Sequence, residues 1–595
     1  MTEYHNPQDD PGAQKRLMLA FLLVFVAIAA MQFFLPKPKP QPQPEKTAEQ
    51  QADQKKEQQQ TSPAAPVTRA TPGKTTPSSA QAAVHRLPVK QGTVPAESVL
   101  ENEYYRITFT NQGGLVKSWV LKKYHDDKGK PLDLVNEASA PMLGYPLSFF
   151  SYDKDLEKKL NESLYVMTVT GSSSAPEAIS FEYSDGEIAV RKTFRPEKMY
   201  VIDADTQVTR NGQGVTAFPQ WPAGLGDQAS LGSFSQARID WDQNGNIERK
   251  SPTSGNFITG RKWIANGQTF NGPFDWVAIV DQYFTVALMP DSPAGTTLVT
   301  LHNQVDVPRS SANPNVKDKV SVLGAAFGHP DGAMHQRIFA GPKAVDLLEA
   351  TQAHAGGPDL RGILDFGTFG FISKPLFLWL KWTYEHMIPN WGWAIAFLTL
   401  VITMALLPLR VSSMKSSLKM AKIQPQIKAI TEKYKRYSIT DPRRADMQKE
   451  MSELYKREGV NPVGGCFPML LQMPFLFAFY SMLGNAIELR QANFLWIKDL
   501  SAPDPWHLLP ILIVITMFLT QRSTPQTGMD PAQQKMMNLM GPLMIGGISW
   551  GVASGLCVYW AISNLLGYVQ QFFINRSELG QQVRKSRERR ATRKK

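Results

Sequence analysis

Cysteine is almost absent from this chain: its 595 residues include two, Cys466 and Cys557. Two thiols cannot build a disulfide framework, and they cannot form a cysteine-based zinc site without other ligands. The sequence also lacks HExxH and Walker motifs, and its long apolar stretches carry almost no ionisable side chain. Ion-coupled transporters usually need such charges inside the membrane. We therefore expect a protein that is neither an enzyme nor a secondary transporter and that holds no metal or cofactor.

The apolar residues are concentrated at the N-terminal end and in the last third of the chain. Residues 17–35 form a run of 19 residues with one polar member. At about 1.5 Å per residue such a helix covers the ~30 Å hydrocarbon core, whereas the apolar region of a signal peptide is usually about 7 to 15 residues long. Lys15 and Arg16 place the start of this run in the cytoplasm. We expect a cytoplasmic segment at 1–16 and a retained transmembrane anchor at 17–35.

The next part of the chain changes from a polar linker to a β pattern. Residues 36–93 are rich in Pro, Gln and Lys and cannot bury a core, so we expect a disordered tether. Residues 94–352 contain short alternating runs between Gly, Asn, Asp and Pro turns, which predicts a largely antiparallel all-β sandwich. His329 and His335 are interpreted as loop residues rather than metal ligands. Its aromatic side chains could line a sugar groove, but core packing is favoured.

The last third of the chain predicts a helical membrane core, preceded by an amphipathic interfacial helix at 369–390. The apolar stretches there are short or contain Pro and Gly, so we expect an irregular bundle. Together with the N-terminal anchor they make six transmembrane helices. The five predicted core spans are 391–409, 463–483, 506–519, 536–550 and 554–573.

Charge gives the orientation of these spans. Residues 410–458 carry 13 basic and 6 acidic residues, a net charge of +7, and the tail at 576–595 carries 9 basic and 2 acidic residues, again +7. Residues 486–505 carry a net charge of −1. Because positive loops stay in the cytoplasm, both termini are expected there, with the β domain on the opposite side of the membrane. Cys466 and Cys557 would then lie near opposite faces and could not pair.

The basic segment at 410–459 also has apolar residues at three- to four-residue intervals, which predicts a cytoplasmic helical hairpin. It is either a folded positive-inside loop or a docking surface for acidic partners, ribosomal RNA or lipid headgroups. The basic tail at 576–595 is open to the same interpretation. Next to a membrane span, ribosomal RNA or anionic lipid is a more plausible contact than DNA.

Several segments of the core resemble one known family. They are VNPVGGCFPMLLQMPFLFAFYSML at 460–483, AIELRQANFLWIKDLSAPDPWHLLPIL at 486–512, DPAQQKMM at 530–537 and SGLCVYWAISNLLGYVQQ at 554–571. This combination resembles the YidC family of membrane protein insertases, in the Gram-negative form with a large periplasmic domain. The resemblance implies a periplasmic β-supersandwich and an insertase core at 391–575. It also implies a hydrophilic groove that is open to the cytoplasm and to lipid.

The same resemblance implies a location and partners. The location is the bacterial inner membrane, and the clients are nascent membrane proteins, inserted alone or with the Sec translocon. The ribosome, the signal recognition particle with its receptor, and membrane lipids are further partners implied by the family.

The groove residues implied by the resemblance fall into three groups, and no catalytic residue is among them. They are a polar lining of Thr403, Gln472, Gln521 and Trp560, a charge at the mouth from Arg410 and Lys415, and an apolar slide of Met473, Pro474 and Phe475. Many relatives have an arginine where this chain has Thr403, five positions before Pro408, so we hypothesise that Arg410 or Lys415 partly replaces that charge. Ala553 is a second departure, because relatives often have proline there.

One alternative from another functional class remains at this point. In it the chain is a membrane-anchored periplasmic carbohydrate-binding or envelope-assembly protein whose β domain is the active part. Deleting that domain discriminates the two, since an insertase should retain its core activity.

Overall fold

The computed structural model describes residues 87–582 with internal gaps. The gaps are at 127, 173–174, 229–233, 235, 253–261, 309–314, 356, 435–436, 438–440, 461–466, 525–530 and 579–580. The predicted anchor at 17–35, most of the tether at 36–93, Cys466 and most of the tail at 576–595 lie outside the described residues.

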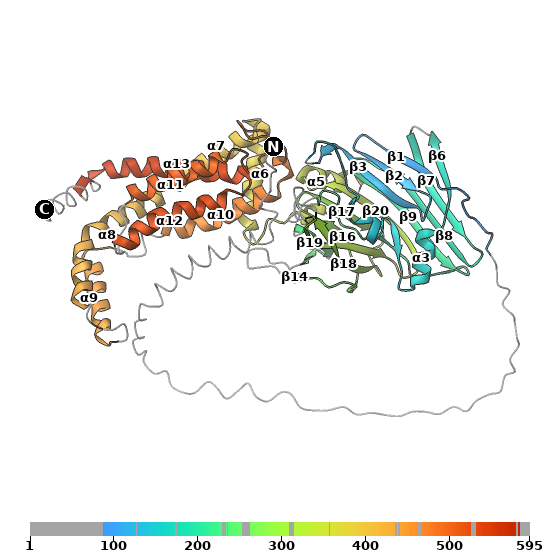
Figure 1. Cartoon of the computed structure of the whole chain (residues 1–595), viewed down its shortest axis with the longest axis horizontal. Coiled ribbons are helices and arrows are strands. Elements are labelled where there is room, and N and C mark those ends of the chain that lie inside the picture. Colours follow the sequence, from blue (N-terminus) through green and yellow to red (C-terminus); the bar gives the residue numbers. More distant parts are fainter. Residues whose placement is uncertain are drawn as a thin grey trace, which may run out of the picture. The chain divides into compact units, whose positions relative to one another are not determined.

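The first part of the described chain is a β domain with three sheets (Figure 1). The four-stranded sheet has the order β1 (Glu97–Glu101), β2 (Tyr105–Thr110), β3 (Leu115–His125), β4 (Pro131–Asp133). The five-stranded sheet has the order β15 (Thr269–Asn271), β18 (Thr297–Pro308), β19 (Lys317–Gly328), β11 (Phe218–Trp221), β5 (Ser148–Phe150). The domain also contains the helices α2 (Ala140–Leu143) and α3 (Lys154–Glu162).

The third sheet is the largest, with eleven strands. Its order is β14 (Lys262–Trp263), β13 (Asn246–Ser251), β12 (Arg238–Gln243), β16 (Trp276–Val280), β17 (Phe284–Pro290), β20 (Ala333–Pro342), β9 (Val201–Arg210), β8 (Ile188–Pro196), β7 (Ala175–Ser184), β6 (Val166–Ser172), with β10 (Gln213–Gly214) paired to β9. Among the strand pairs of the described residues, β13 and β14 run parallel and the others run antiparallel. Consecutive antiparallel strands, such as β6 to β9, are joined by short turns, whereas the pairs β12–β16, β17–β20 and β20–β9 join strands that are distant in the chain.

Burial in the β domain follows the sequence pattern of each strand. Every residue of β16 and β17 is buried, and Thr285 is the one polar residue of these two otherwise apolar strands, as expected where both faces of a sheet are covered. In β2, by contrast, Tyr105, Ile107 and Phe109 are buried while Arg106 is exposed. This alternation identifies β2 as a strand with one face on the core and one in solvent.

The aromatic residues of the β domain belong mostly to its core. Trp221 and Phe218 are 1% exposed, and Phe274 and Trp276 are fully buried. Trp263 is the exception among these aromatics, at 52% exposed. Core packing therefore accounts for them better than a sugar-binding groove does.

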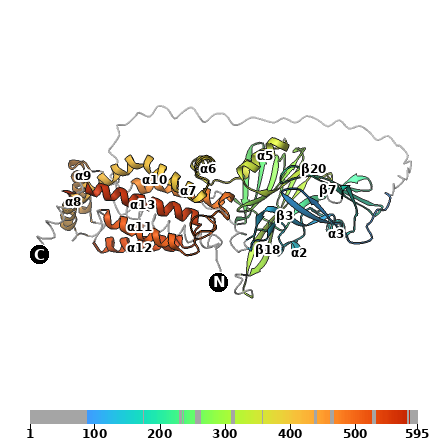
Figure 2. The ribbon, with the colours of Figure 1, turned by 90° about the horizontal axis from the view of Figure 1, so that it is seen from above.

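Helices make up the rest of the described chain. They are α5 (Val345–Ala355), α6 (Gly370–His386), α7 (Trp391–Ala405), α8 (Leu407–Tyr434), α9 (Arg443–Arg457), α10 (Phe467–Asn485), α11 (Leu508–Ser523), α12 (Pro531–Ser549) and α13 (Ser554–Arg576), with short 3-10 helices at Leu360–Ile363 and Ile487–Leu489. Helices α10 to α13 run alongside one another in both Figure 1 and Figure 2, and α7 packs on α13.

Helices α7 and α8 are separated by a bend of 57°. Helix α7 begins after Asn390, whose side-chain oxygen accepts a hydrogen bond from the backbone N–H of Trp393 at 3.1 Å. Pro408 follows the last turn of α7 and has no N–H to continue its hydrogen-bond ladder. Thr403 consequently lies in the last turn of α7, and Arg410 lies in the first turn of α8.

By length and composition, no single helix among the described residues meets the requirements for crossing a membrane. The bent pair α7–α8 meets them when its two helices are taken together, and α11 is a shorter apolar helix. The predicted β sandwich and the helical C-terminal region are confirmed, whereas the count of six transmembrane helices is not.

Candidate functional site

A pocket lies among α7, α8, α10 and α13, and we call it the groove. It encloses ≈ 530 Å³ of empty space, including space open to the outside. The groove is lined by Ile402, Thr403, Leu406, Leu409, Arg410, Gln472, Phe475, Tyr559 and Ser563.

The polar residues of the groove come from four different helices. Thr403 on α7 is 7% exposed, and Gln472 on α10 is partly buried. Ser563 on α13 adds a second hydroxyl, and Arg410 on α8 adds a guanidinium. Apolar side chains such as Leu406 and Phe475 separate these polar groups. The groove can therefore hydrogen-bond a few polar atoms while most of its wall stays apolar.

Arg410 was predicted at the mouth of the groove, and its side chain lies among the lining residues. Its Nη1 donates to Oε1 of Gln570 on α13, with 3.2 Å between the two atoms. Lys415, the other predicted mouth charge, is exposed on α8 and does not line the groove.

Two predicted lining residues do not reach this groove. Trp560 is 9% exposed and packs in the apolar core of the helices, beside the lining residue Tyr559. Gln521 on α11 lies against α12, where a Cβ added to Gly541 would be 3.3 Å from its Nε2. Its Oε1 is buried and has no hydrogen-bond partner among the described residues. Contact of Trp560 and Gln521 with a client stays a prediction.

The predicted slide at Met473, Pro474 and Phe475 lies on α10 next to Gln472, and all three side chains are partly buried. Phe475 is the member of this group that lines the groove. Phe479, one turn further on, stacks on Tyr559 with 4.1 Å between the ring centroids and 13° between the planes. This stacking holds α10 against α13.

Sequence reasoning assigned α13 to this site through Trp560 and missed the helix face that lines it. Tyr559, Ser563, Gly567 and Gln570 recur at intervals of four, four and three residues, so they share one face of the helix. Tyr559 and Ser563 line the groove, and Gly567 and Gln570 contact Arg410. The sequence shows that spacing. The face can be recognised as part of the groove only when α8 is known to pack against it.

Outside the groove, α8 and α9 form a hairpin with a small apolar core. The buried members of that core are Met420, Ile423, Ile427, Leu454 and Val460. Lys433 Nζ lies 2.5 Å from Glu450 Oε1, and the hydroxyl of Tyr434 donates to the same oxygen at 2.8 Å. The hydrogen bond from Lys433 lowers the pKa of Glu450. The hairpin surface around this pair is rich in basic side chains.

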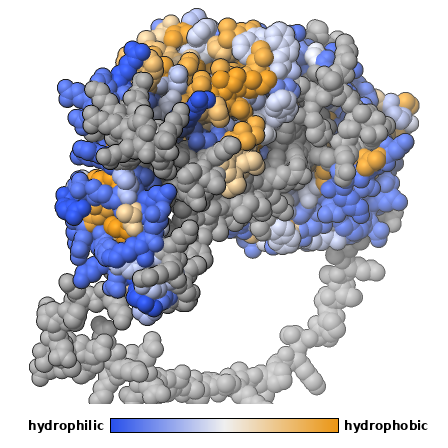
Figure 3. All heavy atoms as spheres, turned by 60° about the vertical axis from the view of Figure 1, so that its left-hand side comes forward, coloured by the Kyte–Doolittle hydropathy of each residue, from blue (hydrophilic) through white to orange (hydrophobic). Residues whose placement is uncertain are grey.

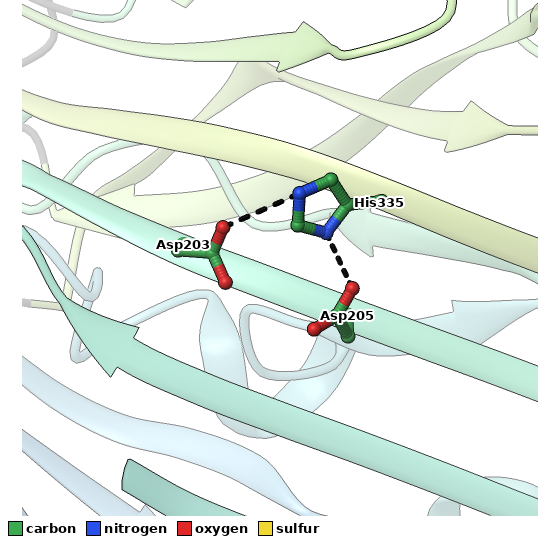
Figure 4. Close-up of side chains that lie close together, drawn as sticks. All are labelled: Asp203, Asp205 and His335. Carbon is green, nitrogen blue, oxygen red and sulfur yellow. Dashed lines mark hydrogen bonds and ion pairs between the residues drawn. The ribbon is translucent and has the colours of Figure 1, made fainter. Parts of the chain in front are cut away.

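A charged cluster lies on the large sheet of the β domain, where β9 carries Asp203 and Asp205 and β20 carries His335 (Figure 4). The ring of His335 hydrogen-bonds Asp205 through Nδ1, and its Nε2 lies 3.5 Å from Asp203 Oδ2. Arg195 Nη1 contacts both aspartates at 2.6 Å. His335 is thus in a strand and not in the loop that the sequence predicted.

Three carboxylates face His335, because Asp291 Oδ2 also lies 2.9 Å from its Nε2. Burial lowers the pKa of His335, but the hydrogen bond and charge of Asp205, with the other two aspartates, outweigh burial and raise it. The donor set of Asp203, Asp205 and His335 could hold a metal ion. Arg195 already pairs with both aspartates of this set, and Arg337 Nε lies 3.7 Å from Asp291. The cluster is adequately described as an ion-pair network across strands.

Comparison with known proteins identifies relatives of the whole chain. The family model described as the YidC periplasmic domain matches residues 98–379, and the model described as the 60Kd inner membrane protein matches residues 382–581. The membrane protein insertase YidC of Geobacter metallireducens is 31% identical over 589 residues, which cover 95% of this chain and 98% of that protein. The protein of the same name from Geobacter sulfurreducens is 32% identical over 490 residues, covering 80% and 85%.

Among solved structures, the crystal structure described as an active YidC insertase with its first transmembrane domain resolved is 18% identical. It covers 82% of this chain and 94% of its own, with a TM-score of 0.34. Both named relatives are insertases, which agrees with the prediction that the chain is not an enzyme and does not favour the carbohydrate-binding alternative. The matches along nearly the whole length of the chain show that it belongs to the YidC family of membrane protein insertases.

Proposed function

We propose that this chain inserts and helps to fold membrane proteins by receiving polar client segments in the groove. The observation that carries the proposal is the meeting of Thr403, Arg410 and Gln472, from three helices, in one pocket with otherwise mostly apolar walls. An apolar wall with a few polar groups suits a client that is itself an apolar helix next to a polar end.

The physical task of the groove is to lower a solvation barrier. An unsatisfied polar group in hydrocarbon costs several kcal/mol, so a polar segment does not cross a bilayer unaided. Hydroxyl, amide and guanidinium groups in the groove would satisfy some of those groups during entry. The apolar part of the client would then partition into lipid, which supplies the driving force without nucleotide hydrolysis.

Arg410 supplies the groove charge in this proposal. Thr403 occupies the position where many relatives have an arginine, and both side chains line the same pocket. Arg410 lies about two helical turns after Thr403 in the chain. It reaches the same pocket because the bend at Pro408 brings the start of α8 beside the end of α7. Lys415 is exposed and plays at most a steering part.

The surface of the helices supports a membrane location. Figure 3 shows apolar residues gathered on the helical part, beside hydrophilic ones. Large apolar side chains are at least one-third exposed on α7, α8, α11, α12 and α13, including Leu400, Met404, Leu409, Ile511, Ile515, Leu539, Met540, Leu543, Leu565 and Phe573. In water such a surface would be unfavourable, whereas lipid covers it at no cost. We place the chain in the bacterial inner membrane as a multi-pass protein.

The two basic segments support a cytoplasmic side for the hairpin and both termini, with the β domain in the periplasm. The α8–α9 hairpin and the tail at 576–595 would contact ribosomal RNA or anionic headgroups. Nascent membrane proteins are the proposed clients. The Sec translocon, the ribosome and the signal recognition particle with its receptor are proposed partners, and DNA is not.

The test is insertion into liposomes that contain the purified full-length chain and no other protein. A single-span client is added, and protease protection of its translocated end is scored against empty liposomes. Protection above the empty-liposome level supports autonomous insertion. Protection equal to that level, with folded protein in the bilayer, would contradict it.

A further inference from the structure

Strand β6 (Val166–Ser172) is an end strand of the eleven-stranded sheet. It pairs with β7 and, among the described residues, with no strand on its other side (Figure 1). Six of its seven residues are exposed, and Met167 is half-buried. In an antiparallel pair only alternate residues direct their N–H and C=O groups to the partner, so the other backbone groups of β6 point away from β7. The sheet therefore ends in a row of backbone donors and acceptors.

The other end strands of the three sheets are protected from pairing with another chain. β4, β5, β14 and β15 have two or three residues each. β1 has five residues, but an antiparallel pair of β1 strands would place the exposed Glu97 opposite Glu101. Short length and charge are usual means by which a sheet edge avoids such pairing. β6 has neither, since its sequence VMTVTGS contains no charged residue and no proline.

The core-side face of β6 is apolar and incompletely covered. Met167 and Val169 lie opposite Phe181 and Ile179 of β7, which are fully buried in the core. Met167 packs against that core, whereas Val169 is 36% exposed. The apolar core thus continues to the edge of the sheet, and one more strand would cover it.

The strand β6 is complementary to a second copy of itself. Its other face carries Val166, Thr168 and Thr170, all exposed, and pairing with β7 is regular across these residues. When two copies run antiparallel about Thr168, Met167 of one copy lies opposite Val169 of the other, and Thr168 lies opposite its counterpart. In this register, residues whose backbone groups point outward meet residues of the same kind. Apolar side chains share one face, hydroxyl groups are concentrated on the other, and no like charges meet.

We propose that β6 is a homotypic interface, at which two copies of this chain join their β domains by antiparallel pairing about Thr168. A second copy fits better than an unrelated strand, because the edge is uncharged and each of its faces matches itself. One strand pair buries less than the ~1,200–2,000 Å² of a stable interface, so the association is weak and depends on concentration. Confinement of both copies to one bilayer raises their effective concentration. The inference does not depend on client insertion.

Cysteine crosslinking of the full-length protein in liposomes tests the pairing and its register. Directly opposite Cα atoms of an antiparallel pair are about 4.5–5.5 Å apart, a distance that a disulfide can join. Thr168→Cys should therefore form a disulfide-linked dimer on mild oxidation. Thr170→Cys is the matched control, because its counterpart lies four residues, or about 13 Å, further along the strand. A mixture of Val166→Cys and Thr170→Cys should crosslink, since these two positions face each other. The wild type, with Cys466 and Cys557, gives the background.

A charge at the centre of the pair distinguishes a second copy from any other contact. Crosslinking between Val166→Cys and Thr170→Cys is measured with Thr168→Lys in both proteins, or with Thr168→Lys in one and Thr168→Glu in the other. Two facing lysines should reduce the dimer about fivefold, and lysine facing glutamate should restore it. The restored dimer also shows that a charged residue at this exposed position leaves the β domain folded.

The crosslinking pattern decides the proposal. Dimers from Thr168→Cys that exceed those from Thr170→Cys about fivefold or more, together with recovery in the lysine and glutamate mixture, support pairing about Thr168. Equal dimer formation by Thr168→Cys and Thr170→Cys would indicate random collision and overturn it. Absence of a dimer above background at the highest ratio of protein to lipid would overturn it as well, and so would equal crosslinking with two lysines and with lysine facing glutamate.

Discussion

Arg410 and Gln570 are 160 residues apart in the chain, and their side chains are joined by a hydrogen bond of 3.2 Å from Nη1 to Oε1. This contact ties the start of α8 to the C-terminal half of α13. It also brings a guanidinium to a pocket wall on which the family pattern led us to expect an arginine at the position of Thr403. The position of the cation is thus set by tertiary packing and not by its place in the motif.

The first prediction concerns that cation. Arg410→Gln should reduce insertion of a client with an acidic translocated segment about tenfold, because a charged hydrogen-bonding partner is lost. Protease protection of the client in liposomes measures this. Thr403→Arg added to Arg410→Gln should recover activity, since both positions line one pocket.

Lys415→Gln is the control for this experiment, because Lys415 is exposed and lies outside the groove. It should insert the acidic client within about twofold of the wild type. Full activity in the double variant Arg410→Gln/Lys415→Gln would refute a role for either charge.

The residues of this site differ in how well the sequence alone predicts their position. Gln472 and Phe475 belong to a dense motif, and the resemblance alone placed them beside the groove. Arg410 was predicted near it, but its depth depends on the bend at Pro408. Gly567 and Gln570 carry no local signal, because a glycine and a glutamine in an apolar helix have many explanations until the facing helix is known.

In the β domain, too, the sequence predicts the local structure but not the long-range contacts. Alternation in β2 and the apolar runs of β16 and β17 predict strands, burial and an all-β domain. Neither the eleven-stranded order nor the pairing of β9 with β20 follows from local pattern, since these strands are more than 120 residues apart. For this reason His335 was interpreted as a loop residue, although it lies directly opposite Asp205 in the sheet.

The second prediction concerns pH and His335. Its pKa is raised in the folded state, so the protonated ring stabilises the fold fully below its unfolded pKa of about 6.5. That stabilisation is lost as pH rises through the higher folded value. Because the side chain is 44% exposed, we expect an effect of about 1 kcal/mol or less. Thermal unfolding of wild type and His335→Asn at pH 6 and pH 8 measures it.

In that comparison the wild type should lose more stability between pH 6 and pH 8 than the variant does. An identical pH dependence in both proteins would show that the carboxylates around His335 do not favour its charged form. Arg195, which binds the same aspartates, is left unchanged as the internal reference for the network.

The third prediction concerns a buried ion pair in the β domain. Arg238 Nε donates to both oxygens of Asp240 at 2.9 and 2.7 Å, and the two side chains are 1% and 0% exposed. Arg238→Met should destabilise the domain by about 3–5 kcal/mol, because it leaves a buried carboxylate without its main partner. Chemical denaturation followed by tryptophan fluorescence measures the loss.

Replacing both partners is the informative comparison for this pair. The double variant Arg238→Met/Asp240→Leu should be more stable than Arg238→Met alone, since no buried charge remains. A double variant that is less stable than the single variant would contradict this. It would mean that the attraction within the pair stabilises the fold by more than the desolvation of the two charges destabilises it.

The fourth prediction concerns the start of α11. Asp504 is 1% exposed; its Oδ1 accepts from the N–H of Trp506 at 3.0 Å and from Trp496 Nε1 at 2.9 Å, and its Oδ2 accepts from the N–H of Leu509 at 2.7 Å. Asp504→Ala should destabilise the helical core by about 2 kcal/mol, because one buried and two partly buried donors lose their acceptor group. Asp504→Asn, which keeps one side-chain oxygen, should destabilise the helical core less than Asp504→Ala does. Equal thermal stability of Asp504→Ala and wild type in detergent would contradict this assignment.

A client that passes through the groove contacts the groove lining, and site-specific crosslinking detects such contacts. A photoreactive amino acid is placed at Ser563, which lines the groove, or at Leu565, two residues away on α13 and 46% exposed. With a client stalled during insertion, we expect strong crosslinking from position 563 and much weaker crosslinking from position 565. Equal crosslinking from both positions, or none from 563 while insertion proceeds, would contradict it.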